Sequence, residues 1–379
     1  ISIFCAVLSY STVTGVIFDG HMPLWAGFGI LAFLFFAVQL ILPMLHDHVS
    51  LEGMTILGGH MVGFAAADAF GMVQLRAPFS NNPAVSLLPV GLAVLTIGIL
   101  DRLVKFTIHR LRGAHRLTHE EKEDRIEHII AREHFEDDSL GFCVGFLLSQ
   151  AAKFQSCGKL EHLHDSTTFK SAAQVLRLAS FSGLFLALLV FATLLASVSH
   201  HRGWHMSRKI VVLQLIASMS AAWTFLFMGE WQFMSWYPEA SPMRAVMLLA
   251  LIGTFIAMAA IFVLDFVADY DLLMPKALRA IISCISIAVG LSWEKAFHGA
   301  QHSITAGMPR REAEMANLVI SAAMVIIVLP AWRLFILPAS LECEEHDDAI
   351  STPEDSDSCS ASYTKDSRVG SKPLPRGQS

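Results

Sequence analysis

The sequence predicts an all-α fold, a polytopic transmembrane helix bundle of about ten spans. Three observations support this prediction. Hydrophobic residues make up 54% of the 379 residues and charged residues only 16%, whereas a soluble domain carries about 25% charged residues. The mean hydropathy is +0.53. The apolar residues also fall in blocks about 20 residues long, the length that a helix needs to cross roughly 30 Å of hydrocarbon.

The expected spans follow these apolar blocks along the chain. Residues 23–45 contain no charged residue, and residues 178–199 contain no ionisable residue. The fifth block is the weakest, because only 13 apolar residues precede Lys153. Ile1 already lies inside an apolar run, so we expect the first span to be truncated. The expected spans are residues 1–18, 23–45, 51–75, 83–104, 139–155, 171–199, 208–233, 243–268, 277–298 and 313–337.

Two segments outside the spans have a different composition. Residues 105–138 connect the fourth and fifth spans, and Ile126, Ile129 and Ile130 form a narrow apolar stripe within this connection. The stripe fits a solvated charged helix, or a helix that docks on the membrane surface or on a protein partner. Residues 338–379 are rich in Ser, Asp and Glu. They cannot bury a core, so we expect a disordered tail to which a protein partner could also dock.

Short matches indicate an internal repeat of four spans. "GMVQ" (71–74) is matched by "GEWQ" (229–232), "ILDRLVK" (99–105) by "VLDFVAD" (263–269), and "CVGFLLSQAAKF" (143–154) by "AVGLSWEKAF" (288–297). Successive copies of a unit with an even number of spans have the same orientation in the membrane, so parallel repeats are expected. The expected organisation is a partial unit at 1–50, a four-span unit at 51–199 that includes the 105–138 connection, a second unit at 200–337, and the tail at 338–379.

The distribution of Lys and Arg orients the chain through the positive-inside rule. If the 105–138 connection is cytosolic, eight basic residues in it and its flanks and five in later connections lie on that side. Nine lie on the opposite side, leaving the tail out. We therefore expect both ends of this integral membrane chain in the cytosol, whereas the sequence does not indicate an organelle.

Ionisable side chains within the spans are the candidate functional residues, because a charge at mid-membrane costs about 2.5–3.5 kcal/mol on insertion scales. Asp68 lies mid-span in a stretch of Gly and Ala, which permits close helix approach, and His60 lies two turns earlier. Glu230 lies among aromatic residues in "FLFMGEWQFMSW". Each could belong to an ion pathway. The structural alternatives are a hydrogen-bonded carboxyl inside the bundle for Asp68 and an interfacial carboxylate for Glu230.

The run "SIAVGLSWEKAFHGAQH" (286–302) places charged groups at the end of the ninth span. Glu294, His298 and His302 are four residues apart and therefore share one helix face. Lys295 points about 100° away from this face and could extend to the lipid headgroups. The run predicts either a column that passes protons or binds a cation, or a helix end that has already left the hydrocarbon.

The leading functional prediction is a transporter or channel for a small ion or solute, with the lipid bilayer as its surroundings and no nucleic acid as a partner. Catalysis is less favoured and no cofactor is expected. The sequence contains no phosphate-binding loop, no TVGYG filter and no regularly spaced arginines of a voltage sensor. The residues expected along the pathway are Asp68, His60, Glu230, Glu294 and His298.

Two alternatives belong to other classes. The first is a membrane metalloenzyme with histidine ligands, because "HRLTH" (115–119) and "HGAQH" (298–302) each place two imidazoles on one helix face, as shared coordination requires. The expected topology puts these two motifs on opposite sides of the membrane, and no particular metal is indicated. The second alternative is a scaffold or sensor that docks partners through residues 105–138 or the tail.

Overall fold

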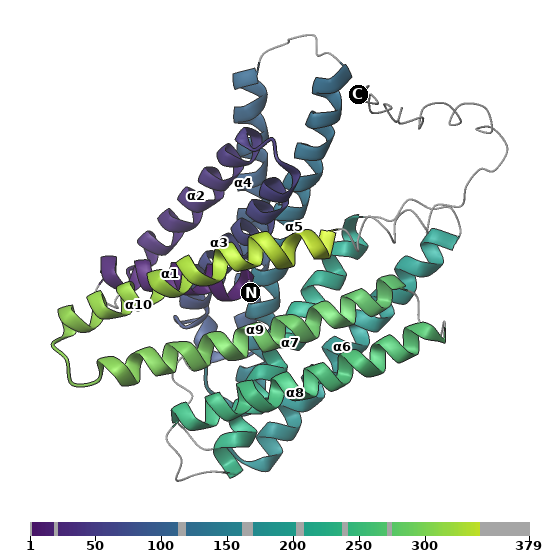
Figure 1. Cartoon of the computed structure of the whole chain (residues 1–379). Coiled ribbons are helices and arrows are strands. Elements are labelled where there is room, and N and C mark those ends of the chain that lie inside the picture. The colour runs from purple at the N-terminus through teal and green to yellow at the C-terminus, as the bar shows by residue number, and fades with distance from the viewer. Residues whose placement is uncertain are drawn as a thin grey trace, which may run out of the picture.

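The computed structural model describes residues 2–18, 22–112, 119–160, 170–201, 208–236, 242–270 and 275–341. Over these residues the fold is all-α, as predicted (Figure 1). Residues 342–379 of the expected tail lie outside the described residues. The α-helices of the described ranges are α1 (Ser2–Phe18), α2 (Leu24–Ile41), α3 (His48–Gln74), α4 (Leu88–Arg112), α5 (His119–Cys157), α6 (Ala172–His201), α7 (Arg208–Trp236), α8 (Pro242–Asp269), α9 (Pro275–Thr305) and α10 (Arg310–Ala331).

Among the described helices, seven are long and apolar enough to cross a membrane: α2, α3, α4, α6, α7, α8 and α10. The chain therefore has the helices of a multi-pass integral membrane protein. The prediction of ten spans is met in part, since α1, α5 and α9 are not in this set. α1 has only 17 residues, α5 carries many charged side chains along its length, and α9 carries two charged residues towards each of its ends.

The odd-numbered helices form a closed circuit of contacts, which we call the inner ring. α1 packs against α3, α3 against α5, α5 against α7, α7 against α9, and α9 against α1. Each even-numbered helix packs mainly on one member of this ring: α2 on α3, α4 on α5, α6 on α7, α8 on α9, and α10 on α1. We call these the outer helices. The three helices outside the seven-helix set all belong to the inner ring.

Burial separates the two sets of helices. In the apolar windows of α3 and α7, 67% and 56% of the residues are buried, against 11–33% in the outer helices. Large apolar side chains such as Phe33 of α2, Leu95 of α4, Phe191 of α6, Phe262 of α8 and Ile326 of α10 are exposed. An apolar surface of this extent is unfavourable in water and typical of lipid contact. Inner helices, shielded from lipid, can therefore carry charge.

Glycine allows the inner helices to pack closely and in parallel. A Cβ built on Gly63 of α3 would lie 2.7 Å from Cβ of Phe142 of α5, and one built on Gly145 would lie 2.5 Å from Cβ of Met219 of α7. Small residues let helix backbones approach in membranes. Contacts advance in the same direction along α3, α5 and α7, so these helices run parallel.

An exposed polar contact links the end of α10 to the start of α3. Asp47 caps α3 by accepting a hydrogen bond from the backbone N–H of Ser50 at 3.0 Å. Nη2 of Arg333, in the π-helical turn η4 (Trp332–Ile336), donates to Oγ of Ser50 and lies 3.8 Å from the Asp47 carboxylate. The hydrogen bonds from Ser50, with the nearby Arg333, hold the pKa of Asp47 below its ordinary value.

The predicted domain organisation and the parallel four-span repeat stay predictions. The 105–138 connection consists largely of helix: it contains the last residues of α4 and the first half of α5. Ile126, Ile129 and Ile130 lie on α5 with exposed side chains. Farther along, Ala131 and Phe135 are buried, so α5 enters the bundle before the expected fifth span begins.

Candidate functional site

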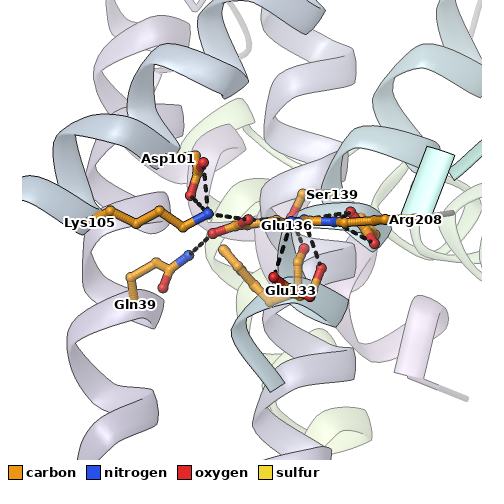
Figure 2. Close-up of polar contacts among 9 residues, drawn as sticks. Gln39, Asp101, Lys105, Glu133, Glu136, Ser139 and Arg208 are labelled. Carbon is orange, nitrogen blue, oxygen red and sulfur yellow. Dashed lines mark hydrogen bonds and ion pairs between the residues drawn. The ribbon is translucent and has the colours of Figure 1, made fainter. Parts of the chain in front are cut away.

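A network of ion pairs, which we call the Arg208 cluster, joins α5 to the first residue of α7 (Figure 2). Nη2 of Arg208 lies 2.7 Å from Oδ1 of Asp137 and 3.0 Å from Oε2 of Glu136, and Nε donates to Asp137 Oδ1 at 2.9 Å. Nη1 of Arg208 lies 3.6 Å from Glu133. Planar Arg donors suit such simultaneous carboxylate contacts.

The same cluster extends to α4 and α2 through Glu136. Nζ of Lys105 lies 3.4 Å from Oε2 of Glu136 and 2.8 Å from Oδ1 of Asp101 one turn earlier. Nε2 of Gln39 donates to Oε1 of Glu136 at 3.4 Å. Figure 2 shows Gln39 and Lys105 on one side of Glu136 and Arg208 on the other. Four helices, α2, α4, α5 and α7, therefore meet at one buried carboxylate.

We expect Arg208→Gln to lower the free energy of unfolding by about 1–3 kcal/mol, because Glu136 and Asp137 then lose a charged donor. The value is below that for a fully buried pair, since Arg208 is partly exposed and solvent screens its charge. Thermal unfolding in detergent measures the effect. Lys209→Gln is the matched control: the neighbouring Lys209 is exposed and makes no ion pair with the described residues. Equal stability of the two variants would contradict a role for the cluster.

A second charged group, which we call the Lys295 cluster, lies near the opposite ends of the inner helices. Nζ of Lys295 on α9 lies 2.6 Å from Oε1 of Glu230 on α7, and these side chains are only 8% and 2% exposed. Glu294 is also buried and interacts electrostatically with both residues. The expected extension of Lys295 to the headgroups is wrong. The reason is that α7 packs beside α9 and offers a buried carboxylate within reach.

Two lysines from different helices share one aromatic ring in this cluster. The ammonium groups of Lys153 on α5 and of Lys295 lie 4.9 Å and 5.0 Å from the centroid of the Phe227 ring. Lys170 similarly lies 5.5 Å from the Trp231 ring. Ring faces attract cations, and more strongly where water is excluded. Lys153 is fully buried, so it belongs to the interior of the bundle and not to a helix end in solvent.

Aromatic side chains separate the two clusters. Phe142 and Phe146 of α5 contact Trp223 of α7 edge-on, with ring centroids 6.0 Å and 5.1 Å apart. Phe64 of α3 contacts Phe142 and Tyr10 of α1. This aromatic layer joins four helices of the inner ring, α1, α3, α5 and α7. Along α5 it lies between the Arg208 cluster and the Lys295 cluster.

The spacing of the two clusters matches a bilayer. Lys153 follows Glu136 by 17 positions on α5. At about 1.5 Å per residue they span roughly 25 Å, close to the ~30 Å thickness of the hydrocarbon. α5 therefore has the length to reach across the bilayer with its charges near both boundaries.

Asp68 and His60 lie on α3, in contact with other inner helices. Tyr10 of α1 donates a hydrogen bond from its hydroxyl to Oδ2 of Asp68 at 2.9 Å. The His60 ring is buried against Phe142, with ring centroids 6.2 Å apart. The structure therefore brings Glu230 and Glu294 together on neighbouring helices, whereas Asp68 lies at the α1–α3 contact.

His298 and His302 contact each other on α9, with their Nε2 atoms 3.2 Å apart. This agrees with the helical spacing of the "HGAQH" motif. His115 of the other motif lies outside the described residues. Within the part of the chain that the structure describes, no group of three or more His, Cys, Asp or Glu side chains is placed to hold a metal ion.

Several charged residues of these clusters were not singled out from the sequence, among them Lys153, Glu136, Asp137 and Arg208. Each lies at the edge of an expected span, where a charge ordinarily faces water. No family model matches the chain, and neither a curated protein nor a solved structure matches it. Function must therefore be argued from the two clusters themselves.

Proposed function

We propose that this protein is a transporter or channel that moves a small ion or solute across the membrane through its inner ring. The observation that carries the proposal is the Glu230–Lys295 ion pair, which is buried between two inner helices. Burying two ions costs several kcal/mol per ion before their attraction offsets it. Ionisable residues retained inside membrane bundles commonly mark ion and substrate pathways.

The arrangement of the clusters supports this proposal. A charged cluster lies towards each end of the inner helices, and the aromatic layer lies between them. Such an arrangement suits a closed pathway in which an ion meets charged groups before and after an apolar constriction. Opening the pathway would require the aromatic side chains to separate and the ion pairs to exchange partners.

Orientation and internal symmetry are part of the proposal. The Arg208 cluster faces the cytosol in the orientation that the Lys and Arg distribution favours. The two lysines at Phe227 come from residues 143–154 and 288–297, the segments that the third repeat match aligns. Parallel four-span repeats would place these two matched segments, with their lysines offset by one position, at one site between the two halves.

Ion flux through the purified protein in liposomes tests the proposal, with K⁺, Na⁺, H⁺ and Cl⁻ gradients imposed in turn. We expect Glu230→Gln and Glu294→Gln each to reduce the flux at least about tenfold, the effect of removing an interaction of roughly 1.4 kcal/mol. Glu312→Gln is the control, because Glu312 is exposed in the first turn of α10. Flux no greater than that of protein-free liposomes, for every ion, would overturn the proposal.

A further inference from the structure

Of the two carboxylate oxygens of Glu230, one is paired and the other has no partner among the residues that the structure describes. Oε1 contacts Nζ of Lys295 at 2.6 Å. Oε2 is buried and accepts no hydrogen bond from the residues that the structure describes. Nearly all buried polar atoms in proteins are paired with protein groups, water or a ligand, so an acceptor of this kind needs a reason.

Further acceptors lie on α9 and α5, the two inner helices that pack against α7. Glu294 precedes Lys295 on α9, is buried, and interacts electrostatically with Lys295 and Glu230. It forms no hydrogen bond or ion pair with the described residues. Gln150, one turn before Lys153 on α5, has a buried Oε1 that is likewise without a partner among the described residues. Carboxylate and amide oxygens are ligands for a cation, and none of them can bind an anion.

The position of the Lys295 ammonium group shows that the surroundings of Glu230 bind a positive charge. Its ammonium group lies against the Glu230 carboxylate and 5.0 Å from the centroid of the Phe227 ring. A carboxylate and an aromatic face together attract a monovalent cation. The ammonium is such a cation, held by a flexible tether of four methylene groups that can swing it away.

We propose that Glu230, Glu294 and Phe227 form a binding site for a monovalent cation, which displaces the ammonium group of Lys295. This proposal rests on the proposed function, because it takes the exchange of the Lys295 ammonium for a free cation as a step of transport. Once the Lys295 ammonium is displaced, one monovalent cation takes its place beside the two carboxylates and leaves a single excess negative charge, which the ammonium of Lys153 at the same Phe227 ring offsets. A divalent ion is disfavoured, because it needs more charged ligands than the described residues bring together here.

The surrounding charges limit the affinity of this site. Lys153 of α5 lies 4.9 Å from the centroid of the same Phe227 ring, and Lys170 lies 5.5 Å from the centroid of the Trp231 ring. His298 follows one turn after Glu294 on the same helix. The two lysines add positive charge and weaken cation binding. Conduction needs binding strong enough for entry and weak enough for release, so a weak site suits transport.

Thermal unfolding of the detergent-purified protein tests the site directly, in KCl, NaCl and N-methyl-D-glucamine chloride at equal ionic strength. We expect K⁺ or Na⁺ to raise the Tm of the wild type relative to the large organic cation, because a ligand that binds only the folded state stabilises it. Lys295→Met removes the competing ammonium. Its half-maximal stabilisation should need about tenfold less cation, within the range of coupling between competing ligands.

Glu294→Gln should abolish the cation response. If the Tm of the wild type is the same in all three salts, and the Tm of Lys295→Met also does not change between the salts, the site does not exist. Should Lys295→Met fail to fold, the double variant Glu230→Gln/Lys295→Met removes both charges. It is expected to fold and to respond to no cation, and a response as large as that of the wild type would overturn the proposal.

The liposome and stability measurements separate the two proposals. Cation-dependent stabilisation without flux would overturn the transport function and leave the cation site supported. Flux of a solute without any change of Tm between the salts would support the transport function and overturn the proposed cation site.

Discussion

Replacing Lys295 by Met is expected to lower the free energy of unfolding by about 3–5 kcal/mol in N-methyl-D-glucamine medium, because Glu230 then keeps a buried carboxylate without its partner. The ion pair is short, at 2.6 Å, and both side chains are almost fully buried. Solvent therefore cannot replace the lost ammonium. Met has a similar length and no charge, so the change isolates the electrostatic contribution from the packing contribution.

The double variant Glu230→Gln/Lys295→Met provides the control for this result. It removes both charges, and replacing a buried ion pair by neutral groups is often close to neutral in stability. We expect it to recover most of the stability that Lys295→Met loses. The four proteins form a double-mutant cycle, measured by thermal or denaturant unfolding in detergent. A double variant less stable than Lys295→Met alone would show that the pair is not the source of the effect.

Gly145→Ala is expected to disrupt the contact between α5 and α7 at a cost of about 1–3 kcal/mol, the range for overpacking a close-packed interior. The new Cβ would lie 2.5 Å from Cβ of Met219 and 3.0 Å from the backbone N of Ser220. No rotamer change relieves contacts with a Cβ and a backbone atom, so the two helices must separate. The loss of Tm in detergent measures the cost.

Gly183→Ala is the matched control on an outer helix. At Gly183 of α6 no atom of the described residues outside its own helix backbone and chain neighbours lies within 4 Å of a Cβ. Ala favours a helix over Gly by about 1 kcal/mol in water, so this variant should be at least as stable as the wild type. If both variants behave alike, the close approach of α5 and α7 does not limit stability.

The positions of the helices could be predicted from the sequence, because the length and apolarity of each apolar block are enough to locate a helix. The weak fifth block is the instructive case. Its low hydropathy follows from its position on the inner ring, where Phe142 and Phe146 pack against α7 and not against lipid. Hydropathy reports exposure to lipid, so it identified the outer helices most clearly and the inner α5 least clearly.

Partners of charged side chains could not be predicted in the same way. Glu230 and Lys295 are 65 residues apart, and Arg208 is 71 residues from Asp137. Such pairs depend on which helices are neighbours, and a single sequence contains no direct signal for that. The interpretation of Lys295 as a headgroup contact failed for this reason. The carboxylates Glu230 and Glu294 were found because a charge inside an apolar block is visible locally.

The parallel course of α3, α5 and α7 has an electrostatic consequence. Each helix carries a dipole equivalent to about half a positive charge at its N-terminus and half a negative charge at its C-terminus. Helices that point the same way in a low dielectric add their fields, so a standing potential runs along the core. Its negative pole lies where Lys153 and Glu230 sit, near the C-terminal ends of α5 and α7. The backbone alone would thus draw positive charge towards that face of the membrane.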